Sequence, residues 1–131
     1  MPDLCAKNDN LSISGITHII LLLFKIRGNM FHVMHMDASG EDDPPLETLP
    51  ELFDELTSSG IVDGSVAVVN DDTGWCVSAH RDGRLIMEHL RDGGERHMIP
   101  VSKERVIEFW RRLVAGDVDG LLKEPWKQGY V

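Results

Sequence analysis

The sequence predicts an α+β domain in which an antiparallel meander sheet of three to five strands packs against two helices. Two segments with apolar residues three and four apart predict amphipathic helices. Between them lie short apolar runs separated by glycine-containing turns, which is the pattern of consecutive antiparallel strands. The length of 131 residues fits one domain, and an apolar content of 42% is ordinary for a globular chain.

Residues 1–29 are treated as a doubtful N-terminal segment, and residues 30–131 as a single α+β domain. The apolar run Ile19–Phe24 is too short for a membrane span, which needs about 20 apolar residues. The stretch before this run carries acidic residues and lacks the basic leader of a signal peptide. We therefore expect a start downstream of the first methionine. The candidates for this downstream start are Met30, Met34 and Met36, and a start at Met1 stays open. An ordinary first strand or helix and a targeting or membrane-surface segment stay open as alternatives.

The first half of the domain predicts a strand, a loop and a helix. "FHVMHMD" alternates apolar and polar residues and predicts an opening strand, and "ASGEDDPP" holds turn formers, acids and two prolines, which predicts a loop. In "LETLPELFDELTSSG", Thr48 and Glu51 have capping-box spacing. The apolar side chains recur at helical spacing, and Gly60 ends the helix.

The middle of the domain predicts four strands, over 65–70, 74–80, 84–90 and 95–101. "DDTG" and "RDGG" supply turns, and Asp82-Gly83 is a strong hairpin signal because a tight turn needs positive φ. Ser102 is placed to cap the second helix, which Gly116 ends. Its predicted buried stripe is Val106, Ile107, Trp110, Leu113 and Val114. The last residues predict a short tail with a single turn.

The chain is strongly acidic, with 13 basic and 22 acidic side chains and a formal charge of −9. Residues 1–29 hold three of the basic and two of the acidic side chains, so the charge of the remainder is −10. Such a surface repels nucleic acid and anionic lipid and attracts basic partners. We expect neither nucleic-acid nor membrane binding. Acidity that serves solubility alone stays open as an alternative.

No residue pattern predicts a metal site, a cofactor or a catalytic group. Cys5 and Cys76 have no C-x-x-C spacing, which fits a reducing cytoplasm and a buried thiol at Cys76. His32 and His35 are three apart, so on a strand they face opposite sides. His80 is expected to pair with the histidine at position 89 across the Asp82-Gly83 hairpin, which gives only two ligands. The acidic loops lack the ligand spacing of a calcium site.

The remaining candidates form an acidic and aromatic surface for a protein partner. Tryptophan is a typical anchor of protein interfaces, although it is equally typical of the edge of a core. The acids lie in two predicted loops. The predicted partner-binding residues are Glu41, Asp42, Asp43, Asp71, Asp72, Trp75 and Trp126.

The domain resembles small bacterial immunity proteins of polymorphic-toxin systems, in the family often encoded beside deaminase toxins. The resemblance covers about residues 46–128 and is carried by Gly74-Trp75, "DGRL" at 82–85, Ile99-Pro100 and Trp126. It implies a cytoplasmic, non-catalytic protein that binds a cognate toxin and occludes its active site. An acidic inhibitor suits a toxin with a basic active-site cleft. A regulatory interaction module with another partner is the alternative, and an enzyme and a small-ligand binder are also left open.

Overall fold

The structure is a computed structural model that describes residues 30–58, 64–99 and 101–131. The doubtful segment 1–29, the predicted helix stop Gly60 and the Pro100 of the resemblance lie outside the described residues. The elements in chain order are β1 (Phe31–Met34), β2 (Gly40–Asp42), a 3-10 turn η1 (Leu46–Thr48), α2 (Leu49–Ser58), β3 (Ser65–Asn70), β4 (Trp75–His80), β5 (Leu85–His89), β6 (Gly93–Met98), α3 (Lys103–Val114), α4 (Val118–Leu122) and β7 (Lys127–Gln128).

The α+β class and the antiparallel sheet packed against helices are confirmed, but the element count is larger than predicted. The described residues form a seven-stranded sheet in the order β2-β1-β3-β4-β5-β6-β7, against three to five strands predicted. Strand β2 lies in the segment predicted as a loop, and β7 lies in the predicted tail. These strands have three and two residues, which is too short for any alternating pattern. Helix α4, with five residues, adds to the two predicted helices.

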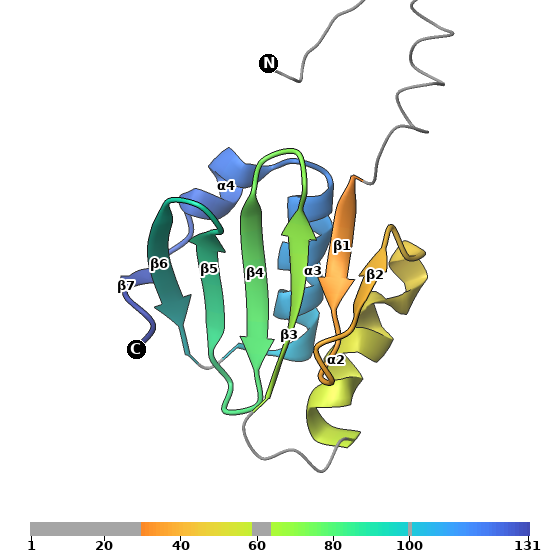
Figure 1. The fold of residues 1–131 in the computed structure, drawn as a ribbon. Helices are drawn as coiled ribbons and strands as arrows, with labels where there is room; N and C mark the ends of the chain where they lie inside the picture. The colour runs from red at the N-terminus through yellow and green to blue at the C-terminus, as the bar shows by residue number, and fades with distance from the viewer. Residues whose placement is uncertain (1–29, 59–63, 100) are drawn as a thin grey trace, which may run out of the picture.

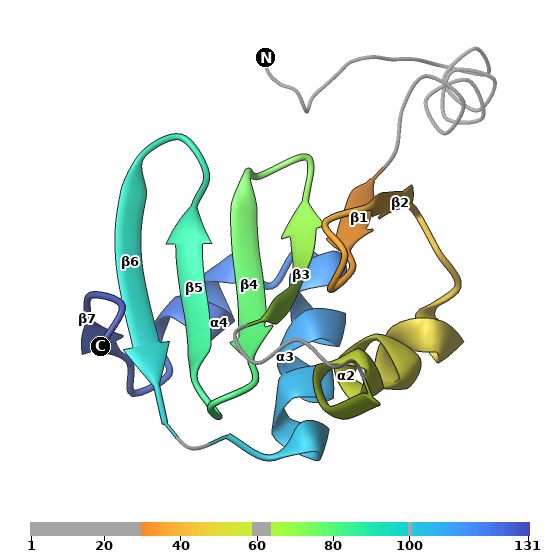
Figure 2. The ribbon, with the colours of Figure 1, turned by 60° about the horizontal axis from the view of Figure 1, so that its bottom comes forward.

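The molecule has two layers, because the helices lie on one side of the sheet. In Figures 1 and 2, α2 and α3 lie against the same face of the sheet, and α4 lies beside β5 and β6 at the end of that layer. We call this the covered face. The opposite face, which we call the open face, looks toward the viewer in Figure 1 and carries no helix of the described residues.

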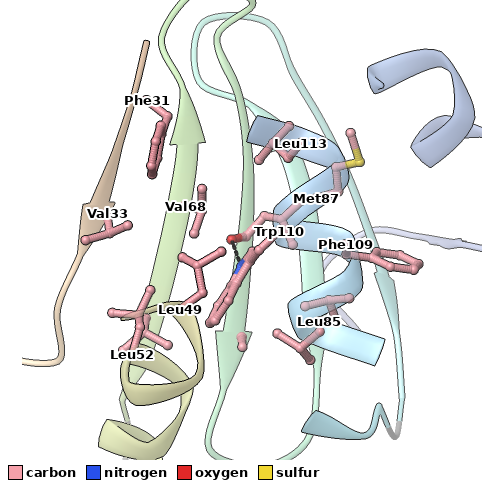
Figure 3. Close-up of a cluster of buried hydrophobic side chains, with 14 of the residues drawn as sticks. Phe31, Val33, Leu49, Leu52, Val68, Leu85, Met87, Phe109, Trp110 and Leu113 are labelled. Carbon is pink, nitrogen blue, oxygen red and sulfur yellow. Dashed lines mark hydrogen bonds between the residues drawn. The ribbon is translucent and has the colours of Figure 1, made fainter. Parts of the chain in front are cut away.

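The core lies between the covered face and the helices (Figure 3). Trp110 of α3 is fully buried, and its indole Nε1 donates to the carbonyl oxygen of Val77 at 3.0 Å. The Ser102 cap is confirmed, since its side chain accepts from the backbone N–H of Arg105. Ile107 and Val114 of the predicted stripe are only half-buried, and Phe109 is buried instead. Phe109 is covered by the ring of Trp126 and by the guanidinium groups of Arg105 and Arg112, which helical periodicity alone does not show.

The hairpin at Asp82-Gly83 is confirmed, but its register differs from the predicted histidine pair. Gly83 has φ of 97°, and the backbone N–H of His80 donates to the carbonyl of Arg84 at 2.9 Å. His89 is opposite Trp75, at the other end of β4. The two histidines are therefore separated by the length of the strand, and the predicted cross-hairpin pair was wrong.

Candidate functional site

The candidate site is a depression on the open face of the sheet. The register places Met34, Ala67, Ser78 and Ile86 side by side on four neighbouring strands. Ala67 and Ser78 are small, and they are 9% and 8% exposed, respectively. Longer side chains surround them, so a hollow of about 660 Å³ opens over the small pair. A hollow of this volume lies within the range of known binding pockets.

The two sides of the depression have different chemistry. On the β1 side, Met34 and Met36 are half-buried and apolar, and their unbranched side chains adapt to the shape of a partner. On the far side lie His80, Arg84, Glu88 and Tyr130. The site therefore joins an apolar side to a side that carries charges and hydrogen-bonding groups.

The C-terminal residues lie along the open face beside β6. The carbonyl of Gly129 accepts from the Nδ1 of the His97 ring at 2.8 Å, and the carbonyl of Tyr130 accepts from Arg84 Nη1 at 3.1 Å. The Tyr130 hydroxyl donates to Glu88 Oε1 at 2.8 Å. This hydrogen bond to a carboxylate raises the pKa of Tyr130 to about 12, and the charge of Glu95 adds to the shift. The tail thereby completes the far wall of the depression.

Four carboxylates lie across one end of this face, from β2 to β6, and we call Asp42, Asp71, Glu88 and Glu95 the acidic row. The strand register aligns Asp42 with Glu88, and the charge of Glu95 acts on the Tyr130 side chain beside Glu88. Asp42 is directly opposite His32 across the β1–β2 pair. The Nδ1 of His32 lies 2.8 Å from Asp71 Oδ1. Burial raises the pKa of Asp71 although the contact with His32 lowers it, and the nearby charges of Asp42 and Asp43 raise it further.

Arg84 does not offset the acidic row, because it has its own partners. Its Nε donates to Asp82 Oδ2 at 2.8 Å, at the hairpin end of the depression. His80 lies beside it, and burial lowers the pKa of this histidine, as does the charge of Arg84. The open face is therefore negative on the side of the acidic row.

Cys76 and Ser78 are buried side chains with nucleophilic atoms in the lining of the depression. Burial raises the pKa of the Cys76 thiol to about 12, and the charge of Glu88 adds to this, so the reactive thiolate is scarce at neutral pH. Ser78 Oγ lies 3.2 Å from His80 Nε2. This contact joins residues two apart on one strand, whose side chains always share a face. The distance alone therefore does not indicate a catalytic pair.

The five predicted acids divide among four places. Asp42 and Asp71 lie on the open face, as described above. Asp43, at φ of 45°, accepts from the backbone N–H groups of Met30 and Phe31 and so holds the start of β1. Asp72 is exposed in the β3–β4 turn. Glu41 lies in a fourth place, because it contacts a histidine on the helix side of the sheet.

That histidine is His35, which joins the sheet to the helix layer. Its Nε2 lies 3.1 Å from Glu41 Oε1, and its Nδ1 lies 2.7 Å from Glu55 Oε2 of α2. The hydrogen bond to Glu55 raises the pKa of His35, and Glu41 adds to the shift, although burial opposes it. Glu41 is thus part of a structural contact between layers.

The two predicted tryptophan anchors lie on the helix side of the sheet. Trp75 packs edge-on against His89 with ring centroids 5.3 Å apart, and Arg96 lies over its ring. Trp126 packs against Phe109, and its Nε1 donates to the carbonyl of Leu121 at 2.7 Å. It directly precedes β7, at the edge opposite β2. The structure does not bring either tryptophan together with the acids of the open face.

The predicted partner-binding residues did not include Met34, Ala67 and Ser78 of the depression, or Glu88 and Glu95 of the acidic row. Glu88 is the acidic residue of the predicted strand 84–90. Because side chains two apart on a strand share a face, its spacing from Ile86 was the available signal. The position of Tyr130 had no signal, because its contacts are with residues more than 40 positions away.

No group of three or more histidine, cysteine, aspartate or glutamate side chains is arranged to hold a metal ion in the described ranges. Among those same residues, no helix is both long and apolar enough to cross a membrane.

Comparison with known proteins does not place the chain in a family. No family model matches it, and no curated protein or solved structure is significantly similar to it.

Proposed function

We propose that this protein is a non-catalytic cytoplasmic immunity protein that binds a cognate bacterial toxin and occludes the toxin's basic active-site cleft. The observation that carries the proposal is the acidic row beside an apolar depression on the open face. Acidic side chains next to accessible apolar surface combine electrostatic attraction, which steers association, with apolar contact that is desolvated on binding.

The charge of the whole chain supports the same partner. The formal charge of −9 attracts a basic protein over distances of about one Debye length, ~8 Å at physiological salt. Toxins that act on nucleic acid need basic clefts, because their substrate is a polyanion. The depression of the open face spans the four neighbouring strands β1, β3, β4 and β5, so it offers a broad contact surface to such a partner.

The first test is the identity of the partner and its inhibition. The full chain, tagged and expressed in its native organism, is used in a pull-down read by mass spectrometry. We expect one stoichiometric basic protein, and we expect the purified chain to abolish that protein's toxic activity. A stoichiometric partner whose activity is unchanged by the chain contradicts the proposal and favours a regulatory interaction module.

A matched pair of variants tests the charge argument. We expect D42N/D71N to slow association with the partner, because two charges of the acidic row are removed. The control E104Q/D119N removes the same charge from α3 and α4, where both side chains are exposed. We also expect the association rate to fall as salt rises. Equal rates for the two variants would exclude the acidic row as the steering surface.

A further inference from the structure

The depression has a shape that suits one long side chain. Its floor is Ala67 and Ser78, whose neighbours across the sheet are the larger Met34 and Ile86. Four adjacent strands span three interstrand spacings of ~4.8 Å, or about 14 Å. This width accepts an extended segment of about four residues, with one side chain pointing down onto the small pair.

The charge of the depression favours a cation at the Glu88 end. Among the described residues, the Tyr130 hydroxyl donates a hydrogen bond to Glu88, and an ionised carboxylate has about four acceptor sites. Its neighbours in the acidic row add negative charge. The positive charge of Arg84 is countered by Asp82 at 2.8 Å, at the other end of the depression.

The walls suit a guanidinium better than an ammonium. The Tyr130 ring, whose residue is 47% exposed, lies beside Glu88. Arginine stacks on an aromatic ring and pairs with a carboxylate through two parallel hydrogen bonds, whereas lysine is a compact, strongly hydrated charge. Met34 provides an apolar surface for the aliphatic part of the side chain.

We propose that the depression over Ala67 and Ser78 receives an arginine side chain from an extended segment of the protein partner, with Glu88 as its ion-pair partner and Tyr130 stacked on its guanidinium. The inference rests on the proposed function for the identity of the partner. The seating of the arginine depends only on the geometry and charge of the open face. A partner segment with arginine and apolar side chains in alternation fits this site.

The test uses a capped synthetic peptide of about eight residues with alternating arginine and leucine, because the depression spans about four residues of extended chain. It is titrated into the isotopically labelled full chain and followed by NMR. We expect saturable shifts at Ala67, Ser78, Glu88 and Tyr130. No saturable shifts at these residues, or shifts confined to the β3–β4 turn, would overturn the proposal.

Two matched pairs of variants locate the site. A67L fills the hollow from the open face, and A115L places the same side chain on an exposed position at the end of α3. We expect A67L to weaken peptide binding at least about tenfold and A115L to leave it unchanged. E88Q removes the ion-pair partner and is expected to weaken binding about tenfold, while E104Q on α3 does not. Thermal unfolding checks the fold of each variant.

Two further outcomes test the position of the site and the kind of ligand that it binds. If A67L is folded and binds the peptide as the unaltered chain does, the proposed site is wrong. If free arginine or spermidine binds as tightly as the peptide, the occupant is a small cation and the inference of a protein segment is wrong.

The same variants separate this inference from the proposed function. If A67L still inhibits the toxin fully, the inference fails while the immunity function stands. If no toxin is bound but the peptide occupies the depression, the immunity function fails and the site stands as a site for arginine-containing segments.

Discussion

The two faces of the sheet are built from the same strands but are stabilised in different ways. On the covered face, Val68 and Val77 are fully buried under Trp110, which contributes both apolar area and a hydrogen bond. On the open face, Ala67 and Ser78 lie at equivalent positions under a hollow. Burial of large side chains stabilises a fold by ~1.5–3 kcal/mol each, so the covered face holds the domain together. The open face therefore contributes less to the stability of the domain.

The largest expected effect is a loss of unfolding free energy on the covered face. We expect W110A to lower the free energy of unfolding by ~3–5 kcal/mol, since it leaves a cavity and removes the hydrogen bond to Val77. The comparison is M34A, which removes a half-buried side chain of the open face and is expected to lower the free energy of unfolding by less than ~1 kcal/mol. Urea unfolding measures both. Similar losses would break the distinction between the two faces.

The next expected effect is on the reactivity of Cys76, which faces the open side. With a pKa of about 12, this thiol should react with a maleimide at least about a hundredfold more slowly in the folded chain than in urea. The C5S variant makes Cys76 the remaining thiol, because the sequence has two cysteines. Labelling is followed by mass spectrometry near pH 8. Equal rates in folded and unfolded chains would show that the floor of the depression is accessible and the thiol ordinary.

A smaller effect is expected at Asn70, which ties the sheet to the helix layer. Its side-chain amide donates to the carbonyl of Leu113 at 2.8 Å, and its oxygen accepts from the backbone N–H of Asp72. We expect N70A to lower the free energy of unfolding by ~1–3 kcal/mol, because buried polar groups lose their partners. The control is T73A in the same turn, where the side chain is exposed. A loss at N70A no greater than at T73A would contradict this account.

The smallest expected effect is the pH dependence of the contact at His35. Its pKa is raised in the folded chain, mainly by Glu55, so its stabilising effect is full below the unfolded pKa of ~6.5. That stabilisation is lost as the pH rises through the raised pKa. We expect H35Q to lower the free energy of unfolding by less than ~1 kcal/mol at pH ~6, and by less than that at pH ~8.5. E55Q should reduce the same pH dependence, because it removes the main cause of the raised pKa of His35. If H35Q lowers the free energy of unfolding more at pH ~8.5 than at pH ~6, this account is contradicted.

The elements that could be predicted from the sequence are those with a strong local pattern. Helix α3 was predicted with its Ser102 cap, and the four strands β3 to β6 were each predicted from an apolar run between turn signals. Gly83 predicted its hairpin because a positive φ is favourable for glycine. Strands β2 and β7 were not predicted, since segments of two or three residues carry no periodicity and are formed by pairing with β1 and β6.

The sequence by itself determined the α+β class, the central meander, the acidic charge and the burial of Cys76, because each follows from composition or local periodicity. Only the tertiary structure decided which acids meet. It placed Asp42 and Asp71 with Glu88 and Glu95 on one face and assigned Glu41 and Asp43 to structural contacts. It also placed Tyr130 beside Glu88, 42 positions away, through strand pairing and the path of the tail. Contacts of this kind depend on register and chain reversal, which local sequence patterns do not encode.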